Sequence, residues 1–120
     1  MAHNVRDLEA LWFKYSLPND QFASDKTVGT AALRLVIANA RRLKVRFINN
    51  GTDIVSLGYD ATVTTTTGVP VPPGQIAEFD WQEDYEEVTR EFWGVSATAG
   101  NPLHITEHIM TATPDRPLAA

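Results

Sequence analysis

Alternating apolar and polar positions dominate the middle of the chain. Leu33, Leu35 and Ile37 occupy every second position, and the same alternation returns over residues 45–49 and 54–59. A period of two is typical of strands with one face buried. The Asn-Asn-Gly sequence between the last two segments is a tight-turn signal, because Asn and Gly tolerate positive φ. We therefore predict three strands here, joined as a meander.

Strand-like segments continue toward the C-terminus. Three prolines in residues 69–74 confine that stretch to a sheet edge, because proline removes a ladder donor. The other predicted strands are Ala61–Thr67, Gln75–Trp81, Phe92–Ala97 and Leu103–Met110. Turn signals every 8–12 residues or so predict an all-β fold, an antiparallel β-sandwich of about seven strands.

The N-terminal stretch has a different periodicity. Residues Asn4–Ser16 place apolar side chains at three- and four-residue spacings, which predicts a short amphipathic helix ended by Pro18. Its stripe comprises Val5, Leu8, Leu11, Trp12 and Tyr15. The stripe either covers the chain's own β-domain or docks on a neighbouring subunit or partner. Leu17–Ala32, rich in Pro, Asn, Asp, Ser and Thr, is predicted to be an extended connection.

These patterns divide the chain into three parts. Residues 1–32 form an N-terminal helical arm and linker, residues 33–110 the β-sandwich domain, and residues 111–120 a flexible tail. The 120 residues suit one small domain, and 43% hydrophobic residues suffice for a core.

Composition narrows the partner classes. The net charge of −5 argues against nucleic acid as the main partner, which needs clustered Lys and Arg. No Cys is present, so disulfides and thiolate metal sites are excluded. We see no signal peptide, and no apolar run approaches the roughly 18–20 residues of a membrane span.

One segment matches a catalytic motif. His104-Ile105-Thr106-Glu107-His108 fits H-x-x-E-H, a zinc-peptidase signature that requires a helix. The surrounding alternation predicts a strand, which puts the two histidines on one face and Glu107 on the other. No P-loop, dinucleotide fingerprint or nucleophile elbow is present in the sequence. We therefore expect no enzyme, no metal and no cofactor.

Two charged segments are candidate contact sites. Arg41, Arg42, Lys44 and Arg46 form a basic cluster that is either a solvated turn or a contact for an acidic surface, such as a neighbouring copy. Residues 82–91 form an acidic insert without EF-hand spacing, predicted to be a solvated or partner-facing loop. Among these residues we single out Arg41, Arg42 and Tyr85 as subunit contacts.

Several turn-and-strand motifs resemble those of small virion domains of tailed bacteriophages. They are A-N-x-x-R at residues 38–42, N-x-G at 49–51, a strand ending in Gly58, the T-T…G…P-G element at 63–74, and the aromatic-x-x-Ser-Ala strand at 92–97. The resemblance spans Leu33 to about Met110. It implies a head-fibre, capsid-decoration or tail-associated structural protein, often a homo-oligomer, with no catalytic residues to carry over.

From this resemblance we expect a decoration protein of the outer capsid shell, assembled in the bacterial host cytoplasm. Its partner would be the major capsid protein or another virion protein, its preferred state a homotrimer, and its anchor Leu8, Leu11, Trp12 and Tyr15. Neither nucleic acid nor a membrane is expected as a partner. The alternative is a tail, neck or fibre adaptor, or a receptor- or glycan-binding module using Trp81, Tyr85 and Trp93 as an aromatic platform.

Overall fold

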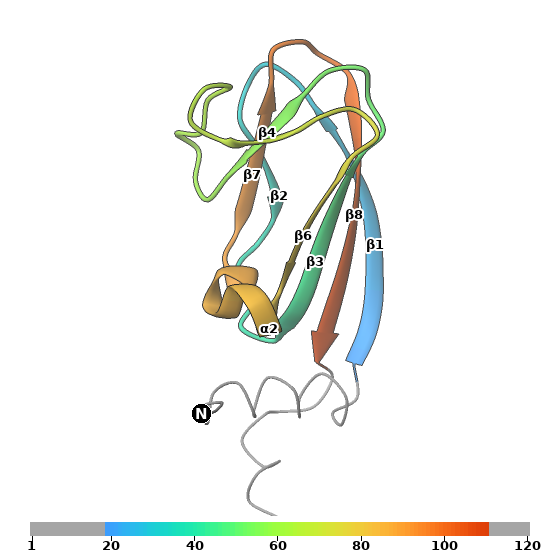
Figure 1. The fold of residues 1–120 in the computed structure, drawn as a ribbon, viewed down its shortest axis with the longest axis vertical. Coiled ribbons are helices and arrows are strands. Elements are labelled where there is room, and N and C mark those ends of the chain that lie inside the picture. Colours follow the sequence, from blue (N-terminus) through green and yellow to red (C-terminus); the bar gives the residue numbers. More distant parts are fainter. Residues whose placement is uncertain (1–18, 111–120) are drawn as a thin grey trace, which may run out of the picture.

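The computed structural model describes residues 19–110, apart from the side chains of Asn19, Gln82, Glu83 and Tyr85. Two antiparallel four-stranded sheets face each other (Figure 1). The long sheet has the order β1 (Asn19–Val28), β8 (Asn101–Met110), β3 (Arg42–Asn49), β6 (Ile76–Asp80). The short sheet has the order β2 (Leu33–Val36), β7 (Phe92–Ser96), β4 (Val55–Gly58), β5 (Val69–Val71). The predicted antiparallel β-sandwich is confirmed, with eight strands in the described part; the predicted N-terminal helix lies outside it.

Aromatic rings fill the space between the sheets. Phe92 of β7 is 1% exposed and Phe47 of β3 is fully buried, with ring centroids 5.2 Å apart. Phe79 of β6 adds a third ring, 5.0 Å from that of Phe92. Aliphatic side chains from both inner faces complete the core: Val28, Leu35, Val45, Val55, Leu57, Val71, Leu103 and Ile105. In β3, β4 and β8 the inward apolar side chains follow the alternation seen in the sequence.

The predicted meander is wrong in its pairing. β2, β3 and β4 lie at the predicted places, but β3 belongs to the long sheet and its two neighbours in the chain to the short sheet. The segment after Asn49 is thus a connection between sheets instead of a hairpin turn. Asn49, fully buried, holds it: its side-chain amide donates to the carbonyl oxygens of Asp53 and Val71, both at 2.8 Å, and its side-chain oxygen accepts from the Gly51 N–H. Alternation shows which residues face the core, but not which strand lies alongside.

The predicted linker over residues 17–32 also needs correction. Asn19–Val28 form β1, which pairs with β8 along its whole length, from Asn19 opposite Met110 to Val28 opposite Asn101. The sandwich therefore includes residues 19–28 as well as 33–110. This strand could not be recognised from the sequence, because Val28 is the one buried side chain among those described in it. No alternation of apolar and polar residues therefore marks the strand.

The threonine-rich run is a loop, not the predicted strand. Asp60 and Thr64 accept hydrogen bonds from nearby backbone N–H groups, and Thr64 also contacts the hydroxyls of Thr66 and Thr67. Side chains that bond their own backbone in this way compete with sheet ladders. The loop packs over β4, because a Cβ built on Gly58 would lie 2.6 Å from Val63.

The acidic insert is helical where a loop was predicted. It contains the short helix α2 (Trp81–Asp84) and the 3₁₀ helix η1 (Tyr85–Thr89). Val88 is fully buried and anchors η1 to the core, whereas Glu86 and Glu87 are exposed. The strands expected on either side correspond to β6 and β7, and the proline-rich segment contributes the short edge strand β5, as predicted.

Candidate interaction surface

The side chain of Arg42, at the start of β3, makes four hydrogen bonds to other described residues. It is 1% exposed, and its Nε donates to Glu107 Oε2 at 2.7 Å. Its Nη1 donates to the carbonyl oxygens of Val88 (3.1 Å) and Arg90 (2.9 Å), and Nη2 to that of Ile37 (2.6 Å). One guanidinium thus joins β3 to β8, to the end of η1 and to the segment after β2.

The prediction that Arg42 contacts another subunit is therefore wrong, because its donors are used inside this one. Lys44 Nζ and Arg46 Nη2 also have a partner within the chain, Glu78 of β6, at 3.0 and 3.5 Å. The Lys44 ammonium holds the pKa of the Glu78 carboxyl below its ordinary value. Of the predicted basic cluster, Arg41 presents an exposed side chain outside these ion pairs. Sequence spacing could not separate the buried arginine from its exposed neighbour.

Other predicted contact residues lie beyond what the structure describes. The proposed anchor residues Leu8, Leu11, Trp12 and Tyr15 fall outside residues 19–110. Tyr85 is the first residue of η1, but its side chain is not among those described. These remain predictions.

The H-x-x-E-H segment lies on β8, and its side chains alternate as predicted. His104 faces outward, where its Nδ1 lies 2.8 Å from Asp25 Oδ1 of β1, and Glu107 faces inward to Arg42. A metal held by both histidines could not reach Glu107 through the strand. No group of three or more His, Cys, Asp or Glu residues is arranged for metal binding between residues 19 and 110.

Tyr59 links the segment after β4 to the helical insert. Its hydroxyl donates to Glu87 Oε1 at 3.1 Å, its ring centroid lies 5.4 Å from that of Phe92, and the Arg90 guanidinium lies 5.0 Å from the ring centroid. Burial raises the pKa of Tyr59, and the hydrogen bond to Glu87 adds to the rise because both favour the neutral phenol.

We expect this contact to give the protein a specific alkaline sensitivity. A raised folded-state pKa means that the stabilisation is complete below the unfolded value near pH 10 and is lost as the pH rises through the folded-state value. Tyr59→Phe should therefore lose less stability than the wild type between neutral and strongly alkaline pH. Urea unfolding at a series of pH values tests this, and parallel pH profiles for the two proteins would contradict it. The effect should be small, because Tyr59 is 37% exposed.

Two of the three aromatic side chains considered for a glycan platform, Trp81 and Trp93, are described by the structure, and these two do not form a shared exposed surface. Trp81 is partly buried and packs against the core, while Trp93 lies on the outer face of β7 and its Nε1 donates to Glu91. They belong to different sides of the short sheet. The described residues therefore give this alternative no stacking surface.

A surface that sequence reasoning missed lies where β1 and β2 form the open side of the sandwich. Asp20–Thr27 are all exposed, although half of these side chains point to the inner side of the long sheet. Phe22 (49% exposed), Leu33 (36%) and Ile37 (60%) are large apolar side chains on this side. A cavity of about 340 Å³ runs between Lys26 and residues 33–37. The isolated Phe22 in a polar segment was the one sequence signal for it.

No protein-family model matches the chain, and no curated protein matches it. Among solved structures, a chain from work on Bacillus endospore appendages, described as a novel family of disulfide-linked pili, is 15% identical with a TM-score of 0.49. The match covers 80% of this chain and 89% of that one. No helix within residues 19–110 is long and apolar enough to cross a membrane.

Proposed function

We propose that this protein is a non-enzymatic structural subunit that works as many copies on the surface of a larger assembly. The open side of the sandwich is the observation that carries this proposal. There, edge strands of both sheets lie beside three exposed large apolar side chains, Phe22, Leu33 and Ile37. An apolar rim beside strand edges that pair with no strand in the described part of the chain favours contact with another protein surface.

The particular assembly we propose is the capsid exterior of a tailed bacteriophage. This rests on the resemblance of the turn-and-strand motifs between residues 38 and 97 to phage virion domains. A shell offers many equivalent binding sites, and each copy of a small subunit without disulfides is stabilised when it binds one of them. The major capsid protein is the proposed partner, and the apolar stripe of the N-terminal segment is the proposed anchor.

Copy number in purified particles tests the proposal. Quantitative mass spectrometry of particles from the source of this chain should find it at hundreds of copies, comparable to the major shell protein. A handful of copies would favour the tail, neck or fibre alternative. Absence from particles would contradict a virion role altogether.

The anchor can be tested with variants matched in charge. We expect Leu11→Asp combined with Trp12→Asp to abolish binding to particles that lack the protein, because two charges would enter the apolar stripe. Ala10→Asp combined with Phe13→Asp adds the same charge to the other side of the predicted helix and should bind normally. Co-sedimentation measures both variants. Equal binding by both pairs would show that the stripe is not the anchor.

A further inference from the structure

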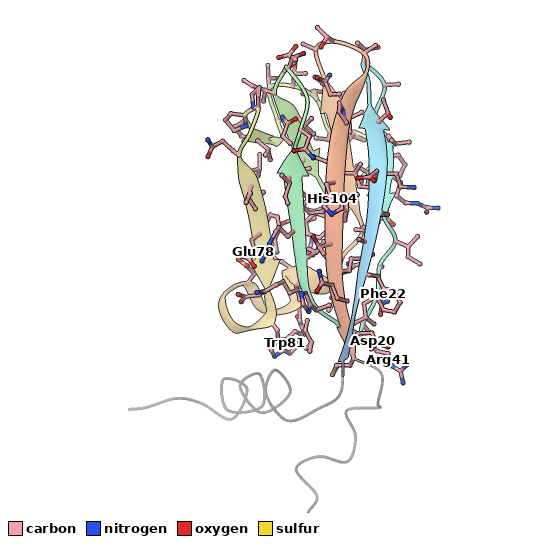
Figure 2. The ribbon with its side chains drawn as sticks, turned by 90° about the vertical axis from the view of Figure 1, so that its right-hand side faces the viewer. Asp20, Phe22, Arg41, Glu78, Trp81 and His104 are labelled. Atoms are coloured by element: carbon pink, nitrogen blue, oxygen red, sulfur yellow. The ribbon has the colours of Figure 1, made fainter. Side chains whose placement is uncertain are left out.

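β1 is an unusually open edge strand. It is the outermost strand of the long sheet, and β8 is its pairing partner among the described residues. Figure 2 views the outer face of this sheet, with β1 along one edge and Phe22 and Asp20 near its lower end. Its outer edge pairs with no strand between residues 19 and 110, and such a ten-residue row of backbone donors and acceptors is a template for a further strand.

Two of the three charged side chains on this strand are arranged symmetrically about its middle, whereas the third, Asp25, lies against His104 of the same chain. Asp20 and Lys26 lie six positions apart, and both project to the inner side, opposite Ile109 and Leu103 of β8. Both side chains are exposed, and neither makes a hydrogen bond or ion pair with another residue between 19 and 110. Midway between them is Ala23.

We propose that β1 pairs antiparallel with β1 of a second copy, about a two-fold axis that passes through Ala23. In this register Asp20 of each copy lies opposite Lys26 of the other, which makes two identical cross-strand ion pairs. Side chains directly opposite in an antiparallel pair are about 4.5–5.5 Å apart at Cβ, close enough for these charges to meet. The two long sheets then form one continuous sheet of eight strands.

The same register accounts for the exposed aromatic ring on this strand. Phe22 lies opposite Ser24 of the other copy, so the two Phe22 rings are diagonal neighbours on the inner side. Diagonal neighbours lie within reach of aromatic side chains. An aromatic pair on the axis would cover a ring that is 49% exposed in the single subunit.

Neighbouring registers lack this complementarity. A two-fold axis perpendicular to the sheet keeps the inner sides together, so the register can change only in steps of two residues. An axis at Ser24 places Asp20 opposite the buried Val28, and an axis at Phe22 places Asp20 opposite Ser24. Neither brings opposite charges together. The axis at Ala23 is favoured because it forms two ion pairs and places no like charges opposite each other.

This inference deepens the proposed function by naming a contact between copies, but it can fail separately from it. The geometry predicts a dimer, in contrast to the homotrimer implied by the phage resemblance. A monomeric protein that still coats particles would overturn the pairing and leave the function standing. A protein that dimerises as proposed but is absent from particles would support the pairing and contradict the proposed function.

A charge-swap experiment tests the pairing. Analytical ultracentrifugation of the full chain should show a reversible dimer whose association weakens with salt. Asp20→Lys and Lys26→Asp should each lower the association constant by about tenfold or more, because each places like charges opposite one another twice. The Asp20→Lys/Lys26→Asp double variant restores both ion pairs with reversed polarity and should recover dimerisation. The single variants shift net charge in opposite directions, so a general charge effect could not weaken both.

A cross-link tests the register. The chain has no Cys, so a single introduced thiol reports on one position. Residues on a two-fold axis of antiparallel strands face their own copies at distances that allow a disulfide. Ala23→Cys should therefore form a covalent dimer under mild oxidation, and Thr27→Cys, on the same face four residues away, should not.

Each outcome decides the matter. A wild type that stays monomeric at high concentration, with the edge covered by residues 1–18 of its own chain, overturns the pairing. A trimer, or a dimer unaffected by both single charge reversals, also overturns it. Efficient cross-linking through Thr27→Cys but not Ala23→Cys would reject the proposed register. Loss of dimerisation in both single charge-reversal variants, with recovery in the double variant, supports the proposed pairing.

Discussion

Replacing Arg42 with alanine is expected to destabilise the domain by about 3–5 kcal/mol, the usual cost of leaving a buried charge without its partner. Glu107 loses the Nε contact at 2.7 Å, and three backbone carbonyl oxygens lose their donor at the same time. Small domains are stable by about 5–15 kcal/mol, so the variant should lie near the limit of folding. Urea unfolding followed by tryptophan fluorescence gives the measurement.

Two further variants sharpen this test. Arg41→Ala changes the exposed neighbour and should alter stability by no more than about 0.5 kcal/mol. Arg42→Lys keeps the charge but lacks the planar fork that reaches several acceptors, so it should remain strongly destabilised. An Arg42→Lys protein as stable as the wild type would mean that charge alone is what matters there. Equal effects of Arg41→Ala and Arg42→Ala would contradict the buried network.

Truncation of Phe92 to alanine is the second large effect, expected to cost about 3–5 kcal/mol. Phe92 is 1% exposed, and its ring contacts those of Phe47, Phe79 and Tyr59 at centroid distances of 5.0–5.4 Å. Removing the ring leaves a cavity that is lined by side chains from both sheets. Thermal unfolding by calorimetry would show a lower midpoint.

The control for this truncation is an apolar residue that is not in the core. Ile76 is 57% exposed at the start of β6, so Ile76→Ala should cost little. Phe92→Leu should fall between the two, because leucine fills part of the space. A cost for Phe92→Ala below about 1 kcal/mol would mean that the sheets close over the gap, contrary to the tight packing of protein interiors.

Strands whose one face is buried could be predicted from the sequence. Val45 and Phe47 lie on either side of Arg46, and Ile105 lies between His104 and Thr106; all three apolar side chains face the core. β1 could not be predicted in this way, because among its described side chains Val28 alone is buried, and polar residues are tolerated on both faces of the rest of the strand. The threonine run showed the opposite error: β-branched residues favour strands, but their hydroxyls bonded the backbone of a loop.

The contact residues show a similar division. The opposite orientation of His104 and Glu107 followed from strand alternation and was predicted correctly. The role of Arg42 depended on carbonyl oxygens from segments 5 to 48 positions away, which no local pattern encodes. The open edge at β1 became visible only when its place in the sheet was known.

The pairing of Asn19 with Met110 has a practical consequence for using this protein as a display scaffold. Residues 19 and 110 lie side by side at one end of the β1–β8 strand pair, and the connection between β7 and β8 lies at the other end (Figure 1). Gly100 is part of that connection, next to Asn101 at the start of β8. Gly100 has φ of 80° and open space around it. A tether attached on the N-terminal side of residue 19 or on the C-terminal side of residue 110 would thus hold the domain by the same end. A peptide grafted beside Gly100 would then point away from the tethered surface.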